Sequence, residues 1–155
     1  MKIQISNTNV PNWRDITVKS RVPEALAPLD EMARNLWWVW NSQATNMFQT
    51  ISPKLWKSTA GNPVQLLQET SYERLEEVMA DRAIMRQIND VYDDFKAYMA
   101  EAKNSQIPSV AYFSMEYGLV NILKIYSGGL GVLAGDYLKE ASDRNVDMVG
   151  VGFLY

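Results

Sequence analysis

A glycine-rich stretch is the part of this sequence best suited to chemistry. Residues 126–131 read Tyr-Ser-Gly-Gly-Leu-Gly, and an apolar pattern with helical spacing follows directly. Glycines let a backbone approach a ligand closely, and the first turn of a helix offers unpaired N–H groups and a partial positive charge. The stretch therefore predicts an anion or oxyanion site. A tight turn that only leads into the helix is the alternative.

The stretch does not match the common nucleotide-binding loops well. No Gly-Lys-Ser/Thr follows it, which excludes a Walker A loop. Gly129, Gly131 and Ala134 fit a loose dinucleotide pattern, but that pattern directly follows its strand, whereas about ten residues separate Glu116 from Gly128 here. A nicotinamide or flavin site is therefore the weaker interpretation.

Three polar side chains around the stretch are candidate ligand contacts: Glu116, Ser127 and Asp136. Glu116 follows the end of a predicted strand, where ligand sites of α/β proteins gather. Asp136 lies in the second turn of the predicted helix. Structural pairing is the alternative role of both acids, and a solvated surface is the default for Lys124 and Lys139.

A tryptophan cluster, Trp37-Trp38-Val39-Trp40, is the second chemical feature. Indole rings can stack on sugar rings, and on a helix Trp37 and Trp40 share a face. Large aromatic side chains also dominate hydrophobic cores, so core packing is the preferred interpretation. Glycan stacking by Trp37 and Trp40 is the alternative.

The composition excludes several kinds of site. The chain has 155 residues, a net charge of −3, no Cys and no His. We therefore predict no metal site, no disulfide and no Ser-His-Asp triad. Lys and Arg do not cluster as nucleic-acid binding requires, and no apolar stretch approaches the roughly 20 residues of a membrane helix. Residues 1–7 lack the apolar segment of a signal peptide. The absence of Cys makes a reducing cytoplasm the expected location.

The elements that would position these residues form two regions. Residues 23–103 read as helices, whose starts are marked by Pro or capping residues: Pro23, Pro28, Ser52-Pro53, Asn62-Pro63, Ser71 and Asp81. Helical spacing predicts two buried faces, Leu29, Met32, Leu36 and Trp40 in the first helix and Ile84, Ile88, Val91, Phe95 and Met99 in the longest. Several short helices and one long helix predict a small bundle.

The second region changes to strand, loop, helix and strand. Residues 110–115 form an apolar run typical of a buried parallel strand. Residues 130–143 predict a helix with one apolar side, made of Leu133, Tyr137, Leu138 and Ala141, and residues 146–155 predict another strand. Because a doubly wound sheet has about five or six strands, two or three strands predict an incomplete sheet in part of a longer polypeptide.

We therefore expect the fold class α plus α/β. A helical N-terminal domain would span residues 1–104, and the truncated start of a Rossmann-like α/β domain would span residues 105–155. The polar residues 104–108, which end in Pro108, would form the linker.

Long stretches of the sequence also carry a family resemblance. Residues 110–119 read VAYFSMEYGL, residues 125–143 read IYSGGLGVLAGDYLKEASD, and residues 149–155 read VGVGFLY. These runs resemble the α-glucan (glycogen/maltodextrin) phosphorylases. Residues 33–41, ARNLWWVWN, look like part of the helical domain that precedes the catalytic domains in one bacterial and archaeal branch.

The resemblance implies a glycosyltransferase of the GT-B type that uses pyridoxal 5′-phosphate. Such enzymes cleave terminal α-1,4 bonds of glucan with inorganic phosphate and release glucose 1-phosphate. The loop matching Gly128, Gly129 and Leu130 lends backbone N–H groups to the phosphate and glucosyl region. The cofactor lysine belongs to the C-terminal domain, so the resemblance gives that role to neither Lys124 nor Lys139. No cofactor is expected to be bound here, and the chain alone is expected to be inactive.

The sequence departs from the family pattern at one position before the glycine stretch. Family members often continue Glu-Phe/Tyr-Gly-Leu with His, whereas here Glu116-Tyr-Gly-Leu is followed by Val120. An apolar side chain therefore replaces a polar one beside the expected site.

Two alternative functions remain open from the sequence, and the exposed strand edges also predict how the chain behaves in solution. The helical region would be a glycan-binding or protein-interaction module, with the tryptophan cluster as its platform. A starch-synthase-like transferase shares the Gly-Gly-Leu-Gly loop but carries Lys-Thr before it, where this chain has Tyr126 and Ser127. Strands near 110–115 and 147–155 would expose edges, which predicts self-association, or disorder after about Gln106.

Overall fold

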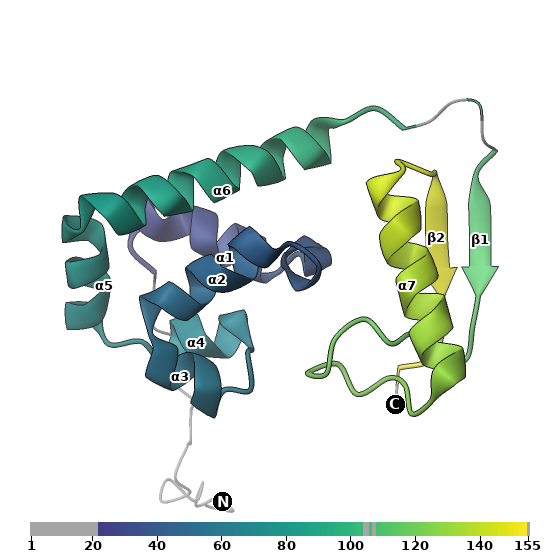
Figure 1. Ribbon diagram of the computed structural model, residues 1–155, viewed down its shortest axis with the longest axis horizontal. Coiled ribbons are helices and arrows are strands. Elements are labelled where there is room, and N and C mark those ends of the chain that lie inside the picture. The colour runs from purple at the N-terminus through teal and green to yellow at the C-terminus, as the bar shows by residue number, and fades with distance from the viewer. Residues whose placement is uncertain (1–21, 104–105, 107, 155) are drawn as a thin grey trace, which may run out of the picture.

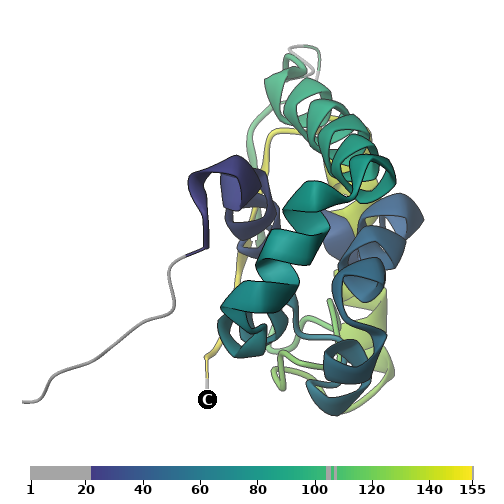
Figure 2. The same cartoon turned by 90° about the vertical axis from the view of Figure 1, so that its left-hand side faces the viewer.

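A computed structural model describes residues 22–103, 106 and 108–154 of the chain. Two units lie side by side along its longest axis (Figure 1): a helical unit that ends with α6, and an α/β unit made of β1, α7 and β2. Figure 2 views the molecule from the helical side, with the α/β unit behind. The prediction of a mainly helical chain followed by strand, helix and strand is confirmed.

Short helices make up most of the helical unit. They are the 3-10 helices η1 (Glu24–Leu26) and η2 (Leu36–Val39) and the α-helices α1 (Ala27–Ala33), α2 (Ser42–Ile51), α3 (Pro53–Ser58), α4 (Pro63–Glu69) and α5 (Tyr72–Ala80). The longest helix is α6 (Arg82–Ala100), which runs along the unit (Figure 1). Isolated helices of six to ten residues are marginal in water, so packing against α6 and against one another must hold them.

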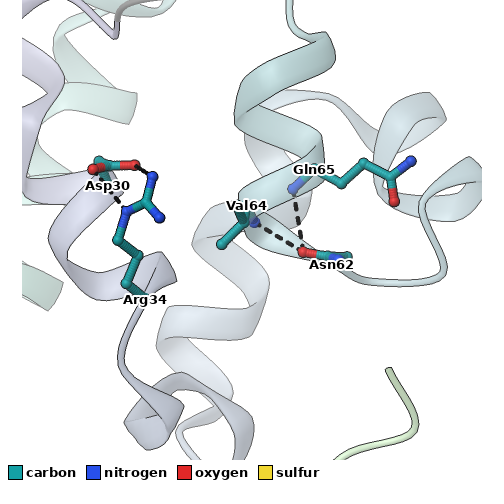
Figure 3. A network of polar contacts seen from close by, with 5 residues as sticks. All are labelled: Asp30, Arg34, Asn62, Val64 and Gln65. Carbon is teal, nitrogen blue, oxygen red and sulfur yellow. Dashed lines mark hydrogen bonds and ion pairs between the residues drawn. The ribbon is translucent and has the colours of Figure 1, made fainter. Parts of the chain in front are cut away.

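Capping side chains begin the helices at the predicted places. The Asn62 carboxamide oxygen accepts hydrogen bonds from the N–H groups of Val64, at 3.1 Å, and Gln65, at 3.2 Å, at the start of α4 (Figure 3). The other predicted caps accept equivalent bonds at the starts of α3, α5 and α6: Ser52, Ser71 and Asp81. Each cap satisfies N–H groups that have no partner within the helix.

The predicted length of the first helix is wrong. α1 ends at Ala33, and a new 3-10 helix begins at Leu36. Asn35 stabilises the break, because its side chain accepts a hydrogen bond from the Trp37 N–H at 2.9 Å and so caps η2. As a result Trp37 and Trp38 both enter the core.

The core of the helical unit is formed by apolar side chains from nearly every helix. The largest fully buried ones are Leu26, Leu29, Met32, Met47, Phe48, Ile51, Leu66, Leu75, Val78 and Ile88. α6 contributes Ile88, Val91 and Phe95, as its spacing predicts, whereas Met99 lies near the end of the helix and is 53% exposed. Ile84, at the start of the predicted face, is half-buried against the core. The predicted α6 face is therefore confirmed in its middle and only partly at its two ends.

The α/β unit is a two-stranded parallel sheet with one helix. β1 (Val110–Phe113) pairs with β2 (Met148–Val151) in a register that sets Val110 opposite Met148 and Phe113 opposite Val151. The connecting helix α7 (Gly129–Asp143) packs against β2 (Figure 1). The parallel pairing agrees with the predicted strand type, and the strands are shorter than predicted.

The predicted buried sides of this unit are wrong in part. Ala141 is buried and Leu138 is half-buried, as predicted, but Leu133 and Tyr137 are exposed. The other buried residues of α7 are small: Gly131, Ala134 and Gly135. The sheet also leaves one apolar face in solvent, formed by Phe113, Val149 and Val151. Small side chains let α7 lie close against the loop that follows β1, and no described residue covers the larger side chains.

Polar contacts join the two units at the C-terminal end of α7. The Trp40 indole N–H donates to Asp143 Oδ1 at 3.0 Å. The Tyr98 hydroxyl contacts Ser142 Oγ at 2.6 Å and Asp143 Oδ1 at 2.9 Å. From the loop after β1, Val120 also packs against the helical core. The α/β unit therefore docks on the helical unit through α7 and this loop.

Candidate functional site

The loop between β1 and α7 folds back onto the start of α7. The Gly118 N–H donates to the Gly131 carbonyl oxygen at 2.7 Å, which ties the loop to the first turn of the helix. Tyr117 is buried, and its hydroxyl donates to the carbonyl oxygen of Tyr112 in β1. Glu116, between the strand and this contact, is thereby placed beside the glycine stretch.

Two glycines of α7 allow this close approach. A Cβ at Gly135 would lie 2.3 Å from the Gly118 carbonyl oxygen, and a Cβ at Gly131 would lie 2.5 Å from the Tyr126 Cβ. Real Cβ atoms do not approach other atoms so closely, so both positions require glycine for packing. Sequence reasoning missed the roles of Gly118 and Gly135. Two glycines one helical turn apart, at 131 and 135, are the signal that could have shown a close backbone crossing.

The Glu116 carboxylate lies against the start of α7. Its Oε1 accepts a hydrogen bond from the Ser127 hydroxyl at 2.9 Å. That bond, together with backbone hydrogen bonds from Ser127, Gly128 and Gly131, holds the pKa of the Glu116 carboxyl below its ordinary value. Of the predicted ligand contacts, Glu116 and Ser127 are therefore brought together, and they bind each other.

The predicted donors Gly128, Gly129 and Leu130 lie at the exposed start of α7. Gly128 is the N-cap residue and provides no capping side chain. Apart from chain neighbours and the backbone of α7 itself, no atom of a described residue lies within 4 Å of a Cβ built on Gly128 or Gly129. No described residue accepts a hydrogen bond from the N–H groups of Gly129 and Leu130. The loop therefore presents two unpaired donors below an open surface.

The other residues singled out near the loop do not contribute to the donor surface. Asp136 forms an ion pair with Lys139 one turn later in α7, at 3.6 Å between Oδ1 and Nζ. Lys124 is exposed. Val120, the position of the family departure, is half-buried against the helical core. Neither of the two lysines nor Asp136 is shown to contact the loop donors.

The tryptophans are used inside the chain. Trp37 is 4% exposed, and its ring packs against Phe95 and Tyr98 at centroid distances of 5.4 and 6.0 Å. Trp40 is half-buried and donates to Asp143. Glycan stacking by Trp37 is therefore not supported, because no exposed indole face is left, and the preferred core interpretation describes this residue.

The described residues contain neither a candidate metal site nor a candidate membrane span. Between residues 22 and 154, apart from 104–105 and 107, no group of three His, Cys, Asp or Glu side chains could hold a metal ion. Within the same residues no helix combines the length and apolarity needed to cross a membrane.

A family comparison places the chain among known sequences. The profile of a family described as "Protein of unknown function (DUF3417)" matches residues 22–123. The chain belongs to the DUF3417 family. The matched region contains the helical unit and β1 and ends before the glycine stretch. The domain boundary predicted after residue 104 falls inside this region and stays a prediction.

Curated relatives of the chain are named as phosphorylases. A glycogen phosphorylase of Aquifex aeolicus is 43% identical over 128 residues, which are 81% of this chain and 18% of that protein. A maltodextrin phosphorylase of Thermococcus litoralis is 41% identical over 145 residues, 89% of this chain and 17% of that protein. A glycogen phosphorylase of Mycobacterium tuberculosis is 36% identical over 154 residues, 92% of this chain and 18% of that protein.

These matches have two consequences for the site. The chain spans less than one fifth of the length of these relatives. Because the Mycobacterium tuberculosis alignment covers 92% of the chain, it includes the glycine stretch as well as the DUF3417 region. No solved structure matches the chain.

Proposed function

We propose that this chain is the N-terminal region of an α-glucan phosphorylase and provides part of its phosphate-binding site. The named relatives, which match 81–92% of the chain, support this assignment. The whole protein would cleave terminal α-1,4-linked glucose from a glucan with inorganic phosphate and release glucose 1-phosphate. In this proposal the α/β unit begins a GT-B-type domain, and the protein is cytoplasmic, as the absence of cysteine favours.

The observation that carries the proposal is the open surface above Gly128 and Gly129. Among the residues that the structure describes, none crowds either glycine, because beyond the local backbone no atom lies within 4 Å of a Cβ built at either position. The backbone N–H groups of Gly129 and Leu130 have no hydrogen-bond acceptor among the described residues. A phosphate or sugar oxygen would satisfy both donors at the positive end of the α7 dipole. Preorganised donors of this kind stabilise negative charge that develops during phosphorolysis.

Pyridoxal 5′-phosphate is the cofactor of the whole protein in this proposal, held outside this chain. Lys139 is paired with Asp136, and Lys124 is exposed, so neither lies in an enclosed site that fits the cofactor. The contribution of the described residues is therefore confined to binding and orienting phosphate and glucosyl oxygens.

A titration of the full chain with inorganic phosphate tests the proposed site. We expect the backbone amide NMR signals of Gly129 and Leu130 to shift with phosphate concentration, because these N–H groups are the unpaired donors. Sulfate serves as a competing tetrahedral anion, and the amides of α4 serve as an internal reference. Saturating shifts elsewhere and none at these two amides would contradict the proposal.

An activity assay tests whether the chain alone can catalyse the proposed reaction. The chain alone, incubated with maltoheptaose and phosphate, is expected to release no glucose 1-phosphate, because the cofactor lysine is not among its residues in this proposal. Turnover by the chain alone would overturn that expectation. It would not affect the phosphate titration, which tests binding only.

A further inference from the structure

The start of α7 has an unusual capping arrangement. The N-cap residue of a helix normally supplies an oxygen that accepts from the next N–H groups, as Asn62 does for α4. Gly128, the N-cap of α7, has no side chain and makes no such bond. A bare N-cap leaves the surface open to a ligand, but it also leaves the first turn of α7 without an anchor of its own.

The Glu116 side chain, 12 residues before Gly128, makes the contact that holds this first turn in place. Its Oε1 accepts from the Ser127 hydroxyl at 2.9 Å. Its Oε2 lies 3.0 Å from the position of a Cβ on Gly131, so the second oxygen reaches the third residue of α7. The backbone N–H groups of Ser127, Gly128 and Gly131 help to lower the pKa of the Glu116 carboxyl, which agrees with this placement. The carboxylate therefore spans the loop on both sides of Gly129 and Leu130.

The base of Glu116 is itself held at the end of β1. Ser114 Oγ donates to the Glu116 carbonyl oxygen at 2.8 Å and accepts from the Glu116 N–H at 3.4 Å. The Ser114 N–H in turn donates to the Val151 carbonyl oxygen at 3.1 Å. Glu116 is thus tied to both strands of the sheet through its backbone and to α7 through its carboxylate.

We propose that Glu116 is a positioning residue that caps α7 in place of Gly128 and leaves only the Gly129 and Leu130 N–H groups for a ligand. Glu116 fills donors that a phosphate would otherwise use, so the loop is a two-donor site for one or two ligand oxygens. It is not a cradle that surrounds a whole phosphate group. This inference rests on the proposed function for the identity of the ligand, but the capping itself does not depend on it.

The test compares Glu116→Ala and Glu116→Gln in the full chain without ligand. The first variant removes the cap, and the second keeps one acceptor oxygen without the charge. We expect amide hydrogen exchange at Gly128 and Gly131 to accelerate about tenfold or more in Glu116→Ala, with partial rescue in Glu116→Gln. Glu140→Gln is the matched control, because Glu140 is an exposed acid of α7 that forms an ion pair with Arg144, away from the loop. Unchanged exchange in Glu116→Ala would overturn the capping role.

The same variants are then titrated with inorganic phosphate. The dissociation constant, followed at Gly129 and Leu130, is expected to rise several-fold in Glu116→Ala as the donors lose their orientation. Tighter binding in this variant would overturn the proposal, because Glu116 would then be a competing anion. If wild type does not respond to phosphate while exchange changes as expected, the proposed function fails and the capping role stands. Ser127→Ala, which removes one hydroxyl, gives a smaller change of the same sign should Glu116→Ala unfold.

Discussion

At the scale of single residues, the glycines around the loop serve two different purposes. Gly131 and Gly135 are crowded, because a Cβ at either position would overlap atoms at 2.5 and 2.3 Å. Gly128 and Gly129 have open space instead, and neither has a positive φ. The first pair therefore serves packing between α7 and the preceding loop. Packing against described residues does not require glycine at the second pair, which directs attention to a ligand.

Replacing a glycine of each pair should separate packing from binding. Gly135→Ala is expected to destabilise the chain by about 1–3 kcal/mol, because the added methyl group overlaps the Gly118 carbonyl oxygen. Gly129→Ala is expected to leave the free energy of unfolding unchanged or slightly increased, since alanine favours the helix. Urea denaturation measures both. Equal losses in the two variants would contradict the distinction.

The Glu116 carboxyl should show its hydrogen bonds in its titration. Its pKa lies below the ordinary value of 4.5, first because of the Ser127 hydroxyl and then because of backbone hydrogen bonds. A lowered folded-state pKa means that the carboxylate stabilises the loop above the unfolded-state pKa. This contribution is lost as pH falls through the folded-state pKa. NMR titration of the carboxyl carbon should give a midpoint below 4.5. A midpoint at or above that value in the folded chain would contradict the bonded geometry.

At the scale of elements, capping residues determine where the helices begin. Asn62, Ser52, Ser71 and Asp81 each accept N–H bonds at a helix start, and each follows from local sequence. The break between α1 and η2 depends on the same chemistry. Asn35 captures the Trp37 N–H after α1 has ended. α7 is the exception, because in our proposal the Glu116 carboxylate, 12 residues before Gly128 and bonded to the Ser127 hydroxyl, takes the place of a local cap.

The Asn62 cap offers a quantitative test at this scale. Asn62→Ala should lower the free energy of unfolding by about 1 kcal/mol, because the Val64 and Gln65 N–H groups lose their acceptor. Asn62→Asp keeps an acceptor oxygen at the positive end of the helix and should retain most of the stability. Urea denaturation followed by circular dichroism compares the variants. A loss in Asn62→Asp as large as that in Asn62→Ala would show that the acceptor is not the cause.

At the scale of the whole molecule, few polar contacts connect the helical unit to α7. Asp143 is shared, because it accepts from both the Trp40 indole and the Tyr98 hydroxyl. These contacts place the C-terminal end of α7 on the helical unit, while Glu116 holds its N-terminal end. The orientation of the candidate site relative to the helices therefore depends on both ends of one helix.

A double-mutant cycle of Tyr98→Phe and Asp143→Ala should reveal this coupling. We expect a coupling energy of about 0.5–1 kcal/mol, because the hydrogen bond between them is partly exposed. Tyr92→Phe is the control, since the Tyr92 hydroxyl bonds Glu31 within the helical unit and lies outside the junction. Additive effects of Tyr98→Phe and Asp143→Ala on urea denaturation would mean that the contact does not contribute to docking.

Self-association of the chain is the second prediction at this scale. The α/β unit exposes large apolar side chains on the sheet, on α7 and in the residues after β2: Phe113, Leu130, Leu133, Tyr137, Val149, Phe153 and Leu154. Light scattering is expected to show oligomers that Leu133→Glu reduces. Tyr72→Glu alters an equally accessible aromatic residue of the helical unit, 60% exposed, and should not reduce association. A wild-type chain that is purely monomeric would contradict the prediction.

Local patterns in the sequence were sufficient for most elements and for the candidate donors. The helix starts depend on neighbouring side chains and backbone N–H groups, so Ser52, Asn62 and Asp81 could be interpreted without a fold. The order of strand, glycine stretch and helix is local in the same way. This order by itself indicates Gly128, Gly129 and Leu130 as the donors, and their role as ligand donors stays a prediction.

Tertiary structure decided which of those residues are free to act. Glu116 and Ser127 were equivalent candidates in sequence, and only the fold of the loop shows that they bind each other. Helical spacing places Trp37 and Trp40 on one face. Because the helix breaks at Asn35, Trp37 instead packs in the core and Trp40 donates a hydrogen bond to Asp143. Such assignments depend on contacts between distant parts of the chain, which local spacing does not encode.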